Sequence, residues 1–438
     1  PDFHRGLLIA AAAVVALAAA SAGAQDHQHV PSPKPAQPAK RERPVVRAVR
    51  MDKAPRIDGV LDESEWAAVP ALESFTQQEP RLGEPATERT EVHVAYDSSH
   101  LYIAVHAYDS HPDEIVASEM RRDSDRLLDE DNFQIILDTF NDSRNGYMFV
   151  TTPLGAKLEQ QVSDEGEGGG RGSNPAINRN WDGVWEAAAH ITDDGWTAEI
   201  AIPTNTLRFL PRDEQTWGVN FERNIRRKNE IVFWAPVPKA YSLTRVSLAG
   251  ELTGMQSLAR GLDLRLKPFL VAGVHDARPS ASLSSTSALH DVGIDARYGV
   301  TAGLNLDLTY NTDFAQVEVD EQQVNLTRFG LLFPEKRDFF IENSGLFTMG
   351  TGTAFSSTPV ETDLFFSRRI GLSSSGAPIP IIGGTRLTGK TGRNNVALLD
   401  IQTDSAFSKP GDNFLVGRYS RDVLKRSRIG AIFVNKES

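Results

Sequence analysis

The chain has 438 residues, enough for two or three domains, and carries a formal net charge of −12 with a pI near 5.4. Such an acidic chain lacks the basic surface that phosphate binding needs, which argues against nucleic acid as a partner. It contains no cysteine, which excludes disulfides, thiolate-ligated zinc, iron–sulfur clusters and thiol nucleophiles.

Residues 1–24 have the pattern of a secretory signal peptide. His4 and Arg5 precede an apolar run from Leu7 to Ala20, and small residues follow it. The run is too short to span a bilayer comfortably and shows no amphipathic stripe, which argues against both a membrane helix and a buried helix. We therefore expect cleavage after Ala24 and export from the cytoplasm. Because the chain begins with Pro1 and not Met, we expect its true start to lie further upstream.

Residues 25–48 form a predicted linker. Prolines recur among its polar and basic residues, and such a composition favours extended polyproline geometry and buries no core. The prolines are Pro31, Pro33, Pro35, Pro38 and Pro44.

Residues 49–255 form the first predicted folded domain. Short runs of alternating apolar residues recur there between turn signals, which predicts a two-sheet β-sandwich. The runs are Val92–Tyr96, Leu101–Val105, Phe133–Leu137, Trp196–Ile202 and Trp217–Phe221. Asp113–Met120 is the best helix candidate, and the glycine-rich stretch Ser163–Arg179 predicts a flexible surface loop or flap.

Residues 256–438 have a different texture, with longer alternating segments whose second face is polar. Val292–Tyr298 and Leu304–Tyr310 predict a hairpin, and the pattern continues to Ile429–Val434. Alternation of this kind fits a sheet with one face in water, and it equally fits an outer-membrane barrel with a polar lumen. Strands that run to the last residues leave a barrel open, so we expect further strands beyond residue 438.

An ordered set of motifs in the first domain resembles the family 9 carbohydrate-binding modules and their DOMON-type relatives. The motifs are Arg56–Trp66, Thr90–Asp97, Leu101–Ile103, Asp129–Asp138 and Gly195–Pro203. The resemblance implies a sandwich that binds a saccharide.

A second set of motifs resembles the family called DUF5916, which has no settled function and is usually interpreted as an outer-membrane barrel. The motifs are Asp313–Asp320, Phe333–Asn343 and Phe366–Gly371. We therefore predict a mainly β chain, with a sandwich followed by the first part of an antiparallel outer-membrane-type β-barrel. The resemblance implies a place in the cell envelope, with outer-membrane lipid as a partner.

The segment Phe333–Phe347 is dense in both charges and aromatic rings. Unpaired charges tolerate neither lipid nor a dry core, so we expect the segment either inside a polar lumen or on a surface loop.

Sugar binding needs flat aromatic faces beside polar groups that hold hydroxyls. The candidates that satisfy this locally are Trp181, Asp182, Trp185, Tyr147, Arg121, Arg122 and Asp123. The two tryptophans flank a glycine turn, which predicts at least one indole at a loop rim. The alternative is that both belong to the core, where we also place Trp66, Trp196 and Trp217.

Asp129 and Asp131 are the candidate calcium ligands. Together with Glu130 and Asn132 they offer the hard oxygens that calcium prefers, and the family 9 modules carry calcium. The run lacks the spacing of a self-contained calcium loop, so a solvated acidic turn is the alternative.

No catalytic residue is predicted, because the chain carries no nucleophile elbow and no metalloprotease motif. His93 and His106 lie in separate strand patterns. The predicted function is that of an exported, outer-membrane-associated protein that binds carbohydrate and that aids its uptake or export. A glycoside hydrolase and a structural barrel without a sugar ligand are the alternatives.

Overall fold

The computed structural model describes residues 43–167, 176–210, 212–259, 264–280, 283–301, 303–312, 335, 337–347, 364–372, 379–406, 410–423 and 427–438. The predicted signal peptide, most of the predicted linker and the motif Asp313–Asp320 lie outside these residues. The described strands form three sheets, and the only α-helices among the described residues are α1 (Ser64–Ala67) and α2 (Asp338–Ile341).

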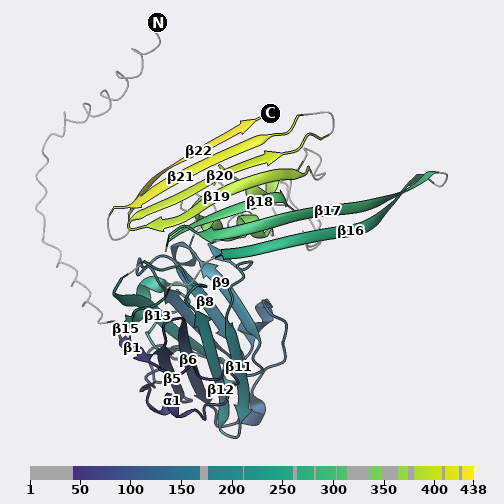
Figure 1. Cartoon of the computed structure of the whole chain (residues 1–438). Helices are drawn as coiled ribbons and strands as arrows, with labels where there is room; N and C mark the ends of the chain where they lie inside the picture. The colour runs from purple at the N-terminus through teal and green to yellow at the C-terminus, as the bar shows by residue number, and fades with distance from the viewer. Residues whose placement is uncertain are drawn as a thin grey trace, which may run out of the picture. The chain divides into compact units, whose positions relative to one another are not determined.

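The first sheet has nine strands, some of which are labelled in the lower part of Figure 1. Its strands are β1 (Val45–Arg47), β4 (Thr76–Glu79), β7 (Asn132–Asp138), β8 (Gly146–Thr151), β9 (Lys157–Val162), β10 (Ile177–Asn178), β13 (Glu214–Ile225), β14 (Glu230–Phe233) and β15 (Gly250–Gln256). Neighbours follow the order β1-β15-β13-β7-β8-β9-β10, with β14 paired to β13 and β4. Strand β1 pairs with β15 in parallel, although Val45 and its partner Glu251 lie far apart in the sequence.

The second sheet has six strands in the order β11-β12-β6-β5-β2, with β3 paired to β5. Its strands are β2 (Val49–Arg50), β3 (Ala71–Leu72), β5 (Thr90–Tyr96), β6 (His100–Tyr108), β11 (Glu186–Thr192) and β12 (Gly195–Pro203). The chain crosses from the first sheet to the second at Ala48, between β1 and β2. The two sheets confirm the predicted sandwich.

The core of the sandwich is built from the alternating residues of both sheets. Each predicted run sends every second side chain inward, because successive side chains of a strand point to opposite faces. The contributions include Val94, Ile103, Ile135, Trp196 and Trp217, each at most 2% exposed. Trp66 is 3% exposed and packs in a neighbouring apolar cluster at α1.

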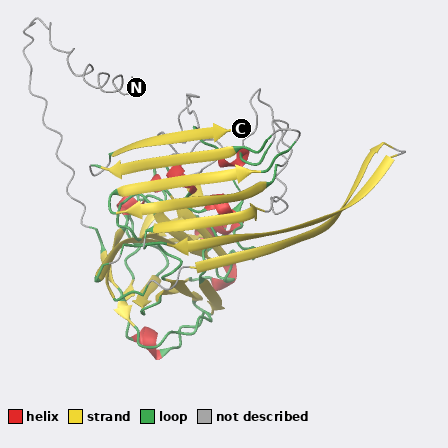
Figure 2. Cartoon of the chain, turned by 45° about the horizontal axis from the view of Figure 1, so that its top comes forward, coloured by secondary structure: helices red, strands yellow, loops and turns green. Residues whose placement is uncertain are grey.

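The third sheet is an antiparallel meander in which each strand pairs with the preceding one (Figure 2). Its strands are β16 (Leu264–Ser280), β17 (Leu283–Gly299), β18 (Leu304–Thr312), β19 (Ile381–Thr391), β20 (Asn394–Thr403), β21 (Asn413–Asp422) and β22 (Arg428–Glu437). The pairing of Tyr298 with Leu306 confirms the predicted hairpin. Strands β16 and β22 are the edges, and the described residues contain no pairing between them.

One face of the third sheet exposes many apolar side chains, and its other face covers polar as well as apolar side chains. One face exposes apolar side chains, such as Tyr310 (62%), Leu398 (45%) and Phe433 (60%). The other face covers polar side chains, such as Asp307 (3%) and Arg386 (1%). Cross-strand register aligns exposed and half-buried residues of this face into an apolar row, which consists of Leu264, Tyr298, Leu306, Leu387, Leu398, Gly417 and Phe433.

Part of the predicted Phe333–Phe347 segment lies on the covered face of the third sheet. We call Glu335 together with residues 337–347 the covering segment; it includes α2 and a 3-10 turn at Ser344–Phe347. Its aromatic rings pack with apolar residues of the sheet in one cluster, which includes Phe339, Phe340, Phe347, Leu399, Ile401 and Val416. Buried Arg337 pairs with Glu335 at 2.8 Å and donates to the carbonyls of Ser367 and Ile370. The charges of this part are therefore paired, as a covered position requires.

Three local predictions are corrected by the structure. Asp113–Met120 is not a helix, because only a 3-10 turn at Pro112–Glu114 forms and the chain then runs irregularly to Met120. Val45–Arg47 is strand β1, so the sandwich begins inside the range predicted as linker. Within the predicted flap, Ile177–Asn178 is strand β10, held by backbone pairing to β9. None of the described helices has the length and hydropathy needed to cross a membrane.

Candidate functional site

Three of the predicted sugar-binding residues meet at one edge of the sandwich. Arg122 donates to the Asp182 carboxylate at 2.7 Å and to the Gly183 carbonyl at 3.0 Å. Asp123 lies beside Arg122, with 3.6 Å between the guanidinium and the carboxylate. Arg121 does not join them, since it is largely exposed and pairs with Glu119.

Glu159 organises this group, although the sequence analysis missed it. Its side chain is fully buried, and it accepts from Arg122 and, at 2.9 Å, from the indole N–H of Trp185. Burial raises the pKa of Glu159, and the hydrogen bond from Arg122 opposes that shift. Glu159 lies opposite Phe149 in the register of β8 and β9, so it occupies a core phase. The sequence did carry a signal for Glu159, because it is a charged residue at a strand position whose side chain points into the core.

The expectation of an indole at a loop rim is wrong. Trp181 is 5% exposed and Trp185 is 3% exposed, and both pack in the sandwich core. Trp181 folds back over Gly183, where a Cβ atom would come within 2.7 Å of the indole, so this turn requires glycine. Tyr147 is also buried, with its ring centroid 5.0 Å from that of Trp181. Burial raises the pKa of Tyr147.

The predicted calcium ligands do not converge on a metal site. Asp131 is 1% exposed, and its carboxylate accepts the backbone N–H groups of Val116 at 2.9 Å and Arg226 at 3.4 Å. Asp129 is exposed at the end of a 3-10 turn. The described residues bring no third acidic or histidine ligand to this pair.

In the described part of the chain, the acidic side chains that do converge are those of Asp58, Glu63 and Glu199. Glu199 is fully buried, and it accepts the backbone N–H groups of Asp58 and Gly59, both at 3.0 Å, and the indole N–H of Trp66 at 2.8 Å. The motif Arg56–Trp66 therefore closes around one buried carboxylate. Burial raises the pKa of Glu199 to about 7, and the charge of Glu63 adds to the rise.

Glu63→Gln is expected to make the sandwich less sensitive to pH. Because the pKa of Glu199 is raised on folding, its contribution to the free energy of unfolding is fully present below about pH 4.5 and is lost as the pH rises through about 7. Removing the neighbouring charge lowers this pKa and should raise the free energy of unfolding at pH 8 by about 1 kcal/mol. Urea midpoints at pH 5 and pH 8 measure the effect. The exposed Glu84→Gln is the control, and an equal loss between the two pH values in Glu63→Gln and wild type would contradict the prediction.

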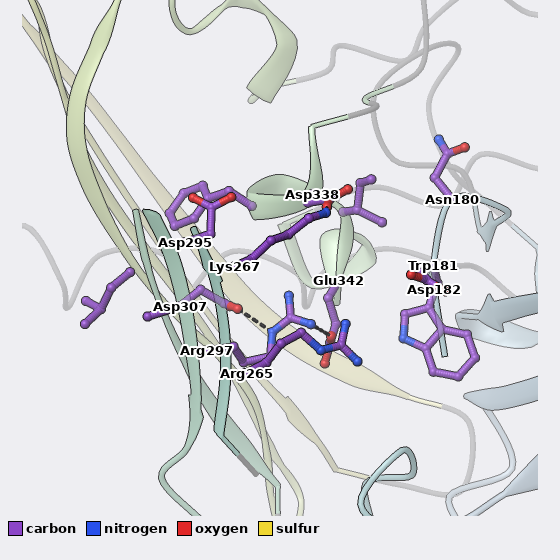
Figure 3. Close-up of a pocket in the computed structure, with 14 residues that line it drawn as sticks. Asn180, Trp181, Asp182, Arg265, Lys267, Asp295, Arg297, Asp307, Asp338 and Glu342 are labelled. Carbon is purple, nitrogen blue, oxygen red and sulfur yellow. Dashed lines mark hydrogen bonds and ion pairs between the residues drawn. The ribbon is translucent and has the colours of Figure 1, made fainter. Parts of the chain in front are cut away.

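Trp181 and Asp182 also form one wall of a polar pocket (Figure 3). The opposite wall is the covered face of the third sheet, with Lys267 and Arg297 among its residues, and the covering segment contributes Glu342. An adjoining pocket shares Trp181, Asp182, Arg265, Arg297 and Glu342, and it adds Asn205, Thr206 and Arg208. The sequence did not predict that residues from both domains line one site.

Ion pairs hold the charged wall of the pocket in place. Arg297 donates to Asp307 at 2.6 Å and pairs with Glu342, and Arg386 donates to Asp307 at 2.9 Å. Lys267 pairs with Asp338. Cations therefore hold Asp307, Asp338 and Glu342 of this wall, and Asp295 accepts a hydrogen bond from the hydroxyl of Thr309 at 2.5 Å.

Side-chain amides of the sandwich fix the covering segment beside the pocket. Asn178 donates to the carbonyl of Ile341, and Asn180 donates to that of Glu335, both at 2.8 Å. Gln161 and Asn343 exchange two hydrogen bonds of 2.9 and 3.0 Å. Strands β9 and β10, together with Asn180 after β10, thus bind the covering segment. Trp181 of the pocket follows Asn180 directly in the chain.

Two family models match different parts of the chain. Residues 57–234 match the model of the carbohydrate family 9 binding domain-like family, and residues 261–385 match that of a domain of unknown function, DUF5916. A search of curated proteins found no match.

Three solved structures are similar to the first part of the chain. A family 9 carbohydrate-binding module from Caldicellulosiruptor kristjanssonii in complex with glucose has 16% identity and a TM-score of 0.34, covering 48% of this chain and 95% of its own. A structure of a family 9 carbohydrate-binding module from the same organism in complex with cellotriose has 17% identity and a TM-score of 0.32, covering 48% of this chain and 93% of its own. A putative carbohydrate-binding protein from Bacteroides uniformis has 12% identity and a TM-score of 0.39, covering 48% and 98%. By the family models, residues 57–234 are similar to the carbohydrate family 9 binding domain-like family, and residues 261–385 are similar to the DUF5916 domain of unknown function.

Proposed function

We propose that the protein is an exported carbohydrate-binding protein whose saccharide binds in the pocket walled by Trp181 and Asp182. The observation that carries this proposal is the pocket that Asn180, Trp181 and Asp182, which lie within the residues that match a carbohydrate-binding family, line together with charged residues of the third sheet. Ring hydroxyls need donors and acceptors in fixed positions, and the paired arginines and carboxylates of the pocket offer both. Phe339 adds an aromatic side chain to the lining.

Asp182→Ala is expected to weaken saccharide binding about tenfold, a loss of ~1.4 kcal/mol, without changing the unfolding midpoint. The Asp182 side chain lines the pocket and is 73% exposed, so its removal takes away a ligand contact at little cost in packing. Isothermal titration of the full chain in detergent micelles against a panel of neutral and acidic oligosaccharides measures the affinity. Asp193→Ala, at an exposed hairpin turn, is the control.

The proposal fails if no oligosaccharide in the panel gives heat, and the structural alternative then stands. Trp185→Ala is unsuitable as a binding test because the indole is buried, and its loss would create a core cavity.

We further propose that the third sheet anchors the protein in the outer membrane as the first part of a barrel. Several large apolar side chains are exposed on one face of this sheet, among them Tyr310, Leu398 and Phe433, and large apolar side chains grouped on a surface mark sites of protein or membrane contact. Outward apolar and inward polar alternation is the pattern of a strand between lipid and a polar interior. The protein would then lie in the cell envelope, and passage of the ligand through the barrel stays a prediction.

The hydrolase alternative has less support than binding. The pocket does contain several carboxylates, which a glycosidase needs as an acid and a base or nucleophile. Three of them are engaged by cations, namely Asp307, Asp338 and Glu342. Although burial opposes the shift, the guanidinium groups of Arg386 and Arg297 lower the pKa of Asp307, which suits positioning better than proton donation. Release of reducing sugar by the purified chain would reverse this preference.

A further inference from the structure

We propose that the sandwich lies on the periplasmic side of the outer membrane, so that saccharide reaches its pocket from the periplasm and not from the medium. This inference rests on the proposed membrane anchor, and it adds the side of the membrane on which binding takes place. It starts from the two ends of the third sheet, which differ in the length of their connections.

One end of the third sheet, which we call the near end, carries short connections. Strand β17 joins β18 through residues 300–303, β19 joins β20 through residues 392–393, and β21 joins β22 through residues 423–427. The chain also enters the sheet at this end, where residues 257–263 join β15 of the sandwich to β16. A link this short spans at most about 30 Å, so it tethers the sandwich to the near end.

The opposite end, which we call the far end, carries the long connections. Residues 313–380 lie between β18 and β19, and residues 404–412 lie between β20 and β21. The third connection of this end is the short turn between β16 and β17, but both strands continue well past the rest of the sheet (Figure 1). Beyond Ile294, the last residue of β17 that pairs with β18, this hairpin adds residues 269–293 at the far end.

Bacterial outer-membrane barrels have the same asymmetry, with short turns on the periplasmic side and longer loops on the outside. The projecting hairpin fits the outer side, because residues 280–287 at its tip are mainly serine and threonine, which suit water better than lipid. The near end therefore corresponds to the periplasmic side of the proposed barrel, and the far end corresponds to the outside.

Ion pairs also hold the sandwich at the near end. Lys390, the next-to-last residue of β19, donates to Asp142 of the sandwich at 2.5 Å, and both side chains are 9% exposed. Arg428, the first residue of β22, donates to Asp164 at 3.2 Å. The tether and these two contacts agree, so the sandwich shares whichever side of the membrane the near end occupies.

The saccharide pocket belongs to the near end as well. Its residues from the sheet include Arg265 and Lys267 near the start of β16, Arg297 near the end of β17 and Asp307 near the start of β18 (Figure 3). A saccharide in this pocket would therefore lie at the periplasmic mouth of the proposed barrel. Capture from the medium would first require passage through the barrel.

The test uses single cysteines, because the chain contains none of its own. Asp193→Cys reports on the sandwich, Arg393→Cys on the near end and Ser405→Cys on the far end, and all three positions are exposed. The full-length protein is exported in a Gram-negative host, and the cells are treated with a polymer-linked maleimide too large to pass porins. We expect Ser405→Cys to be labelled in intact cells, whereas Asp193→Cys and Arg393→Cys should be labelled only after the outer membrane is opened.

Fractionation of the same cells separates failure of the orientation from failure of the anchor. Labelling of Asp193→Cys or Arg393→Cys in intact cells overturns the orientation and leaves the anchor and saccharide binding standing. Protection of Ser405→Cys in a protein that fractionates with the outer membrane also overturns it, because the far end would then not be outside. Recovery of the protein in the soluble periplasmic fraction overturns the anchor and the orientation together. Labelling after denaturation shows that each cysteine is reactive, and the cysteine-free wild type gives the background.

Discussion

Asp307→Ala is expected to destabilise the third sheet by about 3–5 kcal/mol, because it leaves buried guanidinium groups without their counter-charge. Asp307 is 3% exposed and Arg386 is 1% exposed, and Asp307 holds both Arg386 and Arg297. Water cannot replace the carboxylate at so buried a position. Asp307→Asn should cost less, because the amide oxygen still accepts a hydrogen bond.

The two domains can be followed separately in this experiment. All six tryptophans lie between Trp66 and Trp234, so tryptophan fluorescence reports on the sandwich and not on the third sheet. We expect Asp307→Ala to shift the part of the circular dichroism transition that fluorescence does not follow. The exposed Asp404→Ala is the control. A shift of the fluorescence transition alone, or an unchanged dichroism transition, would contradict the claim that Asp307 stabilises the third sheet as the counter-charge of Arg386 and Arg297.

Leu398→Arg is expected to weaken insertion of the chain into lipid vesicles by about 2–4 kcal/mol. Leu398 lies in the apolar row on β20 and is 45% exposed, between Leu387 and Gly417 on the neighbouring strands. An arginine there would have to enter the hydrocarbon if this face meets lipid. In water the same substitution would be nearly neutral, because the site is on the surface.

Gln402→Arg is the matched control for the vesicle experiment. Gln402 lies on the same face of the same strand, is exposed, and is already polar. Denaturant titrations in phosphatidylcholine vesicles give the free energy of each variant. If both variants behave as wild type, or if wild type does not float with the vesicles, the membrane anchor is wrong.

The strands of this protein could be predicted from the sequence because their signal is local. Apolar residues at every second position predicted strands at Val92–Tyr96 and Trp217–Phe221, and both runs lie in observed strands. The helix predicted at Asp113–Met120 does not form. Its apolar spacing also suits an irregular segment, in which Val116 donates its backbone N–H to Asp131. That contact depends on a residue 15 positions later, which no local pattern contains.

The candidate site was harder to predict because it depends on packing between distant segments. Asp182 was found, but its neighbours Arg265 and Glu342 come from the other domain. Trp181 and Trp185 were chosen for their chemistry, and the Gly183 turn directs both rings inward instead. The turn that carries an aromatic side chain decides whether that side chain is buried. The composition of the segment alone does not predict the direction of the ring.

The parallel pairing of β1 with β15 has a consequence for how the sandwich reaches its native state. The first strand of this sheet to be synthesised finds its partner only when residues near Glu251 follow, about 200 positions later. Such a high contact order slows folding and prolongs the exposure of unpaired strand edges, so an early-emerging chain needs protection from aggregation. It also sets the smallest fragment worth producing: one confined to residues 57–234 would lack β1, β2 and β15 and would leave one edge of β13 bare.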